Sequence, residues 1–119
     1  MIIAIDFDGT LVQHKFPEIG EPIEGAFEVL KIMKNDGHKL ILWTCRTDVP
    51  AGNFLTQAVE FCKSKGIEFD AINDNIQPYQ DNIYTNCRKV YADLYLDDKA
   101  IKYETGYWKT ILNIRNTYK

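Results

Sequence analysis

The sequence lacks the features of a membrane protein or of a disulfide-stabilised secreted domain. No apolar stretch approaches the ~20 residues that a membrane-spanning helix needs. Residues 1–5 are apolar, but Asp6 ends the run, so we expect no secretory signal peptide. The cysteines, Cys45, Cys62 and Cys87, are odd in number, widely spaced and without a CxxC pair. This pattern argues against a disulfide framework and a zinc knuckle, and it favours free thiols in a reducing cytoplasm.

An excess of positive charge is also missing. The formal net charge is −3, whereas a protein that coats nucleic acid needs a basic face. We therefore expect a nucleic-acid partner only if a local basic patch provides the binding surface. What is present is ordinary for a folded soluble protein: 45% hydrophobic and 26% charged residues in a chain of 119. This length predicts one domain, residues 1–119, without a linker or repeat.

Strand-like and helix-like segments alternate along the chain. The segments predicted as strands are short apolar runs, which suit a parallel strand buried on both faces: residues 1–5, 39–45, 67–72 and 92–96. The segments predicted as helices carry apolar residues at helical spacing: residues 23–36, 51–65 and 106–117. This order predicts an α/β fold of the Rossmann-like kind, with a mainly parallel sheet inside a three-layer α/β/α sandwich.

Polar side chains that can do chemistry follow three of the predicted strands. They are Asp6 and Asp8 after the first strand, Thr44 and Arg46 after the second, and Asp97 and Asp98 after the fourth. In a parallel sheet the carboxyl ends of the strands share one edge, and ligands bind there. Four carboxylates at one edge repel each other unless a cation neutralises them, and an oxygen-only set without histidine or cysteine favours Mg²⁺. Taken alone, residues 6–9 are explained equally well as a capping aspartate and a turn glycine.

These residues, in this order, resemble the haloacid dehalogenase superfamily. The resemblance rests on Asp6-Phe7-Asp8-Gly9-Thr10 after the first strand, on Thr44 closing the second, and on Asp97-Asp98 closing a later one. It covers residues 1–100 and implies a small phosphatase that hydrolyses phosphate monoesters through an aspartyl-phosphate on Asp6. It also implies that Asp8 is the general acid and base. This second aspartate separates the phosphatases of the superfamily from its dehalogenases, which need no proton donor at this position.

The resemblance further implies how a metal ion and the phosphoryl group are held. The side chains of Asp6 and Asp97, with the backbone carbonyl of Asp8, would hold Mg²⁺. Asp98 would act as a ligand through water or would support the other ligands. Thr44 would donate a hydrogen bond to the transferred phosphoryl group.

The cation that binds the phosphate is not at its usual place in the sequence. Members of the superfamily carry a lysine well before the acidic pair, but residues 66–87 contain none. Lys89 lies upstream of Asp97 along a strand that rises ~3.3 Å per residue, so we expect it at the opposite end of the sheet. Lys99 and Arg46 start closer to the acidic edge. We expect Lys99 to take the lysine's role and Arg46 to bind substrate phosphate through a bidentate fork.

The segments that carry a cap domain in larger members are short here. Residues 11–22 have room only for a hairpin flap, and residues 73–91 are too short for a folded cap. We therefore expect an open site. A second subunit of a homo-oligomer or a large phosphorylated substrate would cover it, since phosphoryl transfer gains from excluding water. The sequence does not define the substrate, which is either a small molecule or a macromolecule.

Three other functions remain open on the same residues. A phospho-receiver of signalling pathways has a similar length and an acidic pair after its first strand. Its phosphoacceptor aspartate, however, ends a middle strand, where this chain has Trp43-Thr44-Cys45. A regulatory protein on an inactive phosphatase scaffold is disfavoured, because every carboxylate that the chemistry needs is present. A phosphotransferase, which passes the group to another alcohol, carries the same residues as a phosphatase.

Overall fold

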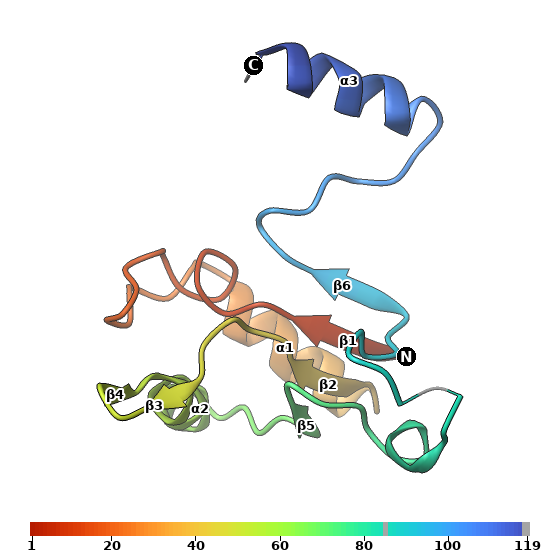
Figure 1. The fold of residues 1–119 in the computed structure, drawn as a ribbon. Helices are drawn as coiled ribbons and strands as arrows, with labels where there is room; N and C mark the ends of the chain where they lie inside the picture. Colours follow the sequence, from red (N-terminus) through yellow and green to blue (C-terminus); the bar gives the residue numbers. More distant parts are fainter. Residues whose placement is uncertain (85, 118–119) are drawn as a thin grey trace.

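The computed structural model describes residues 1–84 and 86–117, and its elements follow the predicted alternation (Figure 1). In chain order they are β1 (Ile2–Ile5), α1 (Ala26–Asn35), β2 (Lys39–Leu42), β3 (Asp48–Val49), β4 (Gly52–Asn53), α2 (Phe54–Ser64), β5 (Ala71–Ile72), the 3₁₀ turn η1 (Tyr79–Asp81), β6 (Leu94–Leu96) and α3 (Tyr107–Thr117). The predicted α/β class is confirmed.

The main sheet has four strands in the order β5-β2-β1-β6, and every pairing in it is parallel. The register pairs Ile5 with both Leu42 and Leu96, so the three strands end at the same level. On one side of β1 the sheet continues to β2 and β5, and on the other side to β6. The strand order therefore reverses at β1, and a parallel sheet of this kind leaves a ligand-binding crevice at the carboxyl ends of the strands that flank the reversal.

The core lies mainly on the sheet face that α1 and α2 cover. Alternate residues of a strand point to opposite faces. Ile3 and Ile5 of β1 therefore face a cluster that includes Phe27 of α1 and Cys62 of α2. On the other face, Ala4 packs with residues of β2 and of the segment that leads to β6. Because both faces of β1 are buried, the chain needs the continuous apolar run that the sequence provides there.

Two helices begin later than the sequence predicts. Gly25 has a φ of 82°, in the left-handed region that favours glycine, so α1 begins at Ala26 and leaves Ile23 outside. Before α2, residues 48–53 form the antiparallel hairpin β3–β4, which the sequence did not predict. Asp48 in this hairpin accepts the backbone N–H groups of Leu55 and Thr56 at 3.0 and 2.9 Å, so it caps α2.

All four predicted strands are shorter in the structure, and two of them lose three or more residues. The predicted strand over residues 39–45 ends at Leu42, because the N–H of Thr44 is donated to the side chain of Asn73 at 2.8 Å. Of the predicted strand over residues 67–72, only Ala71–Ile72 pairs with β2. The residues after Leu42 therefore form a loop at the carboxyl edge of the sheet.

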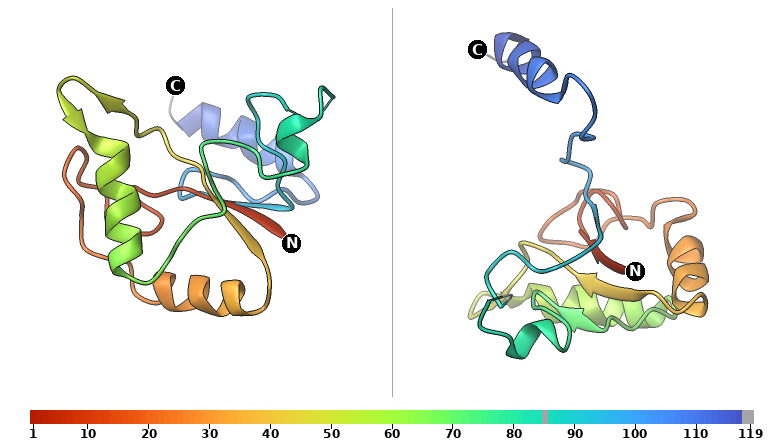
Figure 2. Two further views of the ribbon diagram at one scale, coloured as in Figure 1. Left: turned by 90° about the horizontal axis from the view of Figure 1, so that it is seen from below. Right: turned by 90° about the vertical axis from the view of Figure 1, so that its right-hand side faces the viewer.

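The last helix has the predicted bounds to within one residue but does not pack on the sheet. Figures 1 and 2 show α3 at the end of an extended segment, away from the other elements. Its Trp108 is 75% exposed and its Leu112 52% exposed. The second helical layer of the predicted sandwich stays a prediction. No helix among the described residues is both long and apolar enough to cross a membrane.

Candidate active site

Three carboxylates meet where β1 and β6 end. Asp6 follows β1, and Asp97 and Asp98 follow β6. One carboxylate oxygen from each residue lies within 4.8 Å of the others. The N–H of Asp6 is donated to the carbonyl of Leu96 at 2.9 Å, which ties the two strand ends together. The predicted convergence of Asp6 with the Asp97-Asp98 pair therefore occurs at the crevice that the strand order creates.

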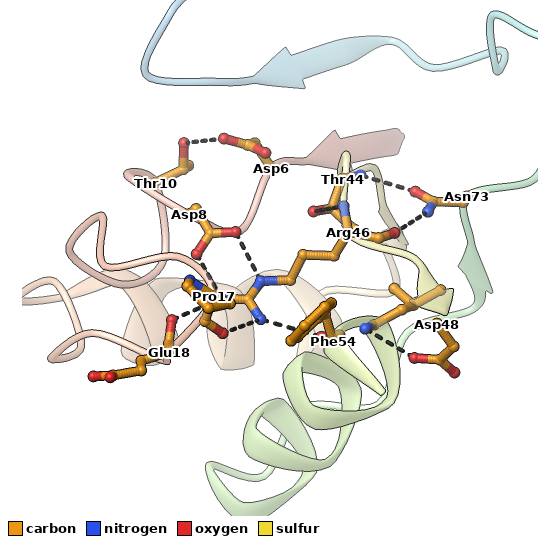
Figure 3. A network of polar contacts seen from close by, with 11 residues as sticks. Asp6, Asp8, Thr10, Pro17, Glu18, Thr44, Arg46, Asp48, Phe54 and Asn73 are labelled. Carbon is orange, nitrogen blue, oxygen red and sulfur yellow. Dashed lines mark hydrogen bonds and ion pairs between the residues drawn. The ribbon is translucent and has the colours of Figure 1, made fainter. Parts of the chain in front are cut away.

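Thr10 connects the two acidic segments, and the sequence reasoning gave it no role of its own. Its hydroxyl oxygen accepts the N–H of Asp98 at 3.0 Å. The same oxygen lies 3.3 Å from a carboxylate oxygen of Asp6 (Figure 3). It also lies 3.3 Å from one of Asp98, so its single hydrogen can be donated to either. The signal that could have identified Thr10 is its place four residues after Asp6 in the same motif.

Within residues 1–84 and 86–117, no ion pair joins these three carboxylates to a lysine or an arginine. The pKa of Asp6 is raised to about 6, mainly by burial and also by the nearby carboxylates of Asp97 and Asp98, although the backbone N–H of Phe7 lowers it. Clustered carboxylates that are partly desolvated bind a hard divalent cation well, since it neutralises the charge and prefers oxygen ligands. The residues present therefore fit Mg²⁺. Asp98 belongs to the cluster through its own carboxylate, a closer involvement than the sequence predicted.

Gly9 allows the side chain of Asp98 to lie close to the loop that follows β1. It has a φ of 88°, and a Cβ atom built on it would collide with the carboxylate of Asp98. Gly37 has the same φ of 88°, but nothing lies within 4 Å of its Cβ position. The two glycines therefore share a backbone conformation and differ in whether a side chain has space.

We expect the Gly9→Ala substitution to lower the free energy of unfolding by about 2–5 kcal/mol, from backbone strain plus the collision with Asp98. Gly37→Ala is the matched control, and its loss should be about 1–2 kcal/mol because only the backbone strain applies. Urea unfolding of the two variants measures the difference. Equal losses would contradict the close packing of Gly9 against the acidic pair.

Asp8 does not join the three other carboxylates. Its two carboxylate oxygens accept Nε and Nη2 of Arg46, each at 2.8 Å (Figure 3). The side chain of Arg46 is 1% exposed and that of Asp8 13% exposed, so this is a buried bidentate ion pair. The predicted metal-binding role of Asp8 is thus limited to its backbone carbonyl, because Arg46 binds its side chain.

Arg46 has a different partner from the one that the sequence predicted. Its guanidinium carries five N–H donors, and all five are used. Two bind Asp8, and three are donated to the carbonyls of Pro17, Glu18 and Phe54. No donor remains to bind substrate phosphate while these bonds hold. The expectation that Arg46 grips the phosphate is therefore corrected: protein acceptors saturate the fork that would have done so.

Thr44 sits in the loop after β2 with its hydroxyl oriented by the backbone. Its Oγ1 accepts the N–H of Arg46 at 3.1 Å, so the hydroxyl hydrogen is left for an acceptor outside the loop. Asn73 holds this loop from the neighbouring strand, since its side chain accepts the N–H of Thr44 and donates to the carbonyl of Arg46. Asn73 has a φ of 51°, a conformation in which asparagine is enriched. The sequence reasoning missed Asn73, whose only signal is its position after a short strand.

A cavity of about 270 Å³ joins these groups. Its lining combines the ends of three strands with the flap: Asp6, Asp8, His14, Phe16, Thr44, Cys45, Arg46, Asp97 and Lys99. Other hollows in the described part of the chain measure 310 to 520 Å³, but the acidic cluster lies in none of them. Phe16 and His14 were not singled out from the sequence. They come from the flap, whose ends pair through the N–H of Gln13 and the carbonyl of Glu21 at 2.8 Å.

The two lysines considered for the phosphate lie in different places. Lys99 lines the cavity, next to Asp97, whose carboxylate accepts its backbone N–H at 2.9 Å. Lys89 lies over the ring of Tyr95, with Nζ 5.3 Å from the ring centroid, and lines a separate hollow with Tyr84 and Tyr91. Of these two lysines, Lys99 lines the cavity of the acidic cluster, and Lys89 packs against Tyr95 of the sheet.

Comparison with known proteins gives a relative but no activity. No protein-family model matches the chain, and no curated protein matches it. A solved structure, that of a conserved protein from Bacteroides thetaiotaomicron, is 38% identical to it, with a TM-score of 0.74. The match covers 97% of this chain and 91% of that one. At this identity and coverage, the chain belongs to the same family as this conserved Bacteroides thetaiotaomicron protein.

Proposed function

We propose that the protein is a Mg²⁺-dependent phosphatase that resembles the haloacid dehalogenase superfamily and forms an aspartyl-phosphate on Asp6. The observation that carries the proposal is the position of Asp6. On one side it belongs to the acidic cluster with Asp97 and Asp98, and on the other it faces a cavity that Thr44 and Lys99 line. A nucleophilic carboxylate needs this combination, because the phosphate that it attacks is itself an anion.

In the first step, a carboxylate oxygen of Asp6 attacks the phosphorus of a bound monoester. The bond from Asp6 to phosphorus forms as the ester P–O bond breaks, and the leaving oxygen takes its proton from Asp8. The Thr44 hydroxyl and the Lys99 ammonium orient the phosphoryl oxygens in the cavity that they line. A Mg²⁺ ion held by Asp6, Asp97 and Asp98, with the backbone carbonyl of Asp8, would neutralise phosphate charge.

In the second step, water attacks the phosphorus of the aspartyl-phosphate. Asp8 accepts the proton of this water, and the bond between phosphorus and the oxygen of Asp6 breaks. Inorganic phosphate leaves and both carboxyl groups return to their starting states. If an alcohol replaced the water, the same residues would perform a phosphotransfer. Identifying the product therefore shows whether water or an alcohol accepts the phosphoryl group.

The size of the cavity supports a substrate that extends beyond it. Ligand pockets for drug-sized molecules measure roughly 300–1,000 Å³, and this cavity of about 270 Å³ has room for a phosphoryl group and its nearest neighbours. The rest of the substrate would lie on the flap or in solvent. We therefore retain as part of the proposal that a large substrate or a second subunit covers the site.

The phosphatase activity is tested with a panel of phosphate monoesters. The panel contains an aryl phosphate, sugar phosphates, nucleotides and 3′-phosphorylated DNA ends, each assayed with Mg²⁺ for release of inorganic phosphate. We expect clear turnover of the aryl phosphate, whose leaving group is good, and a higher kcat/KM for one natural class. Release that never exceeds the background of the Asp6→Asn variant, for every ester, would contradict the proposed function.

The proposal also covers the packing of α3 and the cellular location of the protein. Helix α3 would complete the three-layer sandwich, and its exposed Trp108 and Leu112 support this because they need apolar partners. A cytoplasmic location is supported by the cysteines, since Cys45, Cys62 and Cys87 are all free thiols.

A further inference from the structure

Arg46 is a fully buried cation beside the reacting groups, and its burial needs a reason. The residue is 2% exposed and is the largest fully buried side chain among the described residues. A buried guanidinium is costly unless it is paired and fully hydrogen-bonded. A need for positive charge at this position would not by itself explain the partners of Arg46, which come from three separate parts of the chain.

We infer that Arg46 is a positioning residue that holds the carboxylate of Asp8 and the flap in a fixed arrangement over Asp6. This inference rests on the proposed function, because the orientation of Asp8 matters only if Asp8 exchanges protons with the substrate. Arg46 itself touches no reacting atom. It acts through Asp8. This positioning role takes the place of the direct phosphate contact that the sequence predicted for Arg46.

The contact with Asp8 fixes a plane as well as a distance. Two N–H···O bonds of 2.8 Å run in parallel from one guanidinium to both carboxylate oxygens. Such a fork sets the orientation of the carboxylate, whereas a single charge would allow it to rotate. Each carboxylate oxygen has a further lone pair beyond the one that Arg46 uses. Asp8 can therefore exchange a proton with the substrate while Arg46 keeps it in position.

Arg46 is itself anchored through its backbone. Its N–H is donated to the hydroxyl of Thr44 at 3.1 Å, and its carbonyl accepts the side-chain amide of Asn73 at 3.4 Å. The guanidinium thus starts from the loop that carries the Thr44 hydroxyl. The expected phosphate ligand and the proton-transfer group are held by one connected set of hydrogen bonds.

Two of the three remaining donors of Arg46 hold the flap. Its Nη1 and Nη2 atoms bind the carbonyls of Pro17 at 3.2 Å and Glu18 at 2.8 Å. The rings of Phe7 and Phe16 lie near the guanidinium, each with its centroid 5.1 Å from Cζ. Any displacement of the flap therefore disturbs the group that orients Asp8. A lysine has three donors at one point and no plane, so it cannot make this set of contacts.

A role through Asp8 predicts a dependence on the leaving group. An alkyl phosphate releases an alkoxide and needs a proton in the transition state, whereas p-nitrophenolate leaves readily without one. The kcat/KM value reports the steps up to transfer of the phosphoryl group to Asp6, so it excludes the later hydrolysis step. Loss of the fork should therefore reduce kcat/KM for the alkyl ester selectively.

The test compares Arg46→Lys with the wild-type protein on a simple alkyl phosphate and on p-nitrophenyl phosphate, both with Mg²⁺. We expect kcat/KM to fall about 100-fold for the alkyl ester, the loss typical of a misplaced catalytic group, and less than about threefold for the aryl ester. Arg88→Lys, a substitution at an exposed arginine outside the site, is the matched control and should change neither value. In an Asp8→Asn background, Arg46→Lys should have no further effect on the alkyl ester, because its route of action is already removed.

A second variant keeps the test decisive if Arg46→Lys does not fold. Phe16 is 50% exposed, so Phe16→Leu should preserve the fold while it removes one ring from the guanidinium. It should produce the same selective loss, at about tenfold or less. Equal losses on both esters, or a full additional loss in the Asp8→Asn background, would overturn the role of Arg46 and leave the proposed function standing. A wild-type protein that turns over neither ester would overturn the proposed function and, with it, this inference.

Discussion

The Asp6→Asn variant should lose at least about 10⁴-fold in kcat on every phosphate ester that the wild-type protein hydrolyses, because an amide cannot form the bond to phosphorus. Asp8→Asn should lose about 10²–10⁴-fold in kcat, since Asp8 transfers protons while Asp6 still forms the bond to phosphorus. Steady-state release of inorganic phosphate, measured with Mg²⁺ in excess, separates the two variants. The difference between them follows from their positions: Asp6 lies within the acidic cluster, and Asp8 faces Arg46.

The control for this pair is Asp36→Asn, at the exposed carboxyl end of α1. It changes the net charge by the same amount and should leave kcat unchanged. Circular dichroism of all three variants establishes that they are folded. Comparable kcat values for wild type and Asp6→Asn would refute nucleophilic catalysis by Asp6, whatever the other variants do.

Removal of the divalent cation should abolish turnover. We expect a chelator to reduce kcat by at least about 100-fold and Mg²⁺ to restore it, because Asp6, Asp97 and Asp98 otherwise repel an incoming phosphate. Ca²⁺ should bind but inhibit, since it takes more ligands at longer distances than the near-octahedral Mg²⁺ and would misalign the nucleophile.

The ligand assignment has its own variant. Asp97→Asn should raise the Mg²⁺ concentration needed for half-maximal activity by at least about tenfold, and Asp93→Asn is the control on the same segment. Asp93 lies before β6, where it accepts the N–H of Ile2 at 2.6 Å, and it does not belong to the acidic cluster. Full activity in excess chelator would contradict the metal site.

The sheet and the acidic cluster could be predicted because each depends on a local pattern with a single outcome. A continuous apolar run such as residues 2–5 has to be buried on both faces, which favours a parallel strand. Parallel strands bring their carboxyl ends to one edge, so Asp6 and Asp97 had to be near each other once β1 and β6 paired. The exclusion of Lys89 followed from the same reasoning, because strand length alone separates it from that edge.

The partner of Arg46 could not be predicted, because position along a strand does not decide between a protein anion and a substrate anion. Arg46 starts at the expected edge, but its contacts with Pro17, Glu18 and Phe54 depend on how the flap folds over the loop. The flap has no regular pattern in the sequence that fixes its path. The late start of α1 was missed for a similar reason, since Pro22 suits a helix start and the left-handed conformation of Gly25 overrides it.

The most direct test of the account is the location of covalent phosphate during turnover. The protein, and the Asp8→Asn variant that slows hydrolysis of the intermediate, are mixed with a radiolabelled phosphate ester and Mg²⁺ and then quenched in acid. Peptide mapping of the quenched chain should find the phosphate on Asp6 as a hydroxylamine-sensitive acyl phosphate, with more of it in Asp8→Asn. Turnover without any covalent phosphate, or phosphate on a residue other than Asp6, would contradict the account.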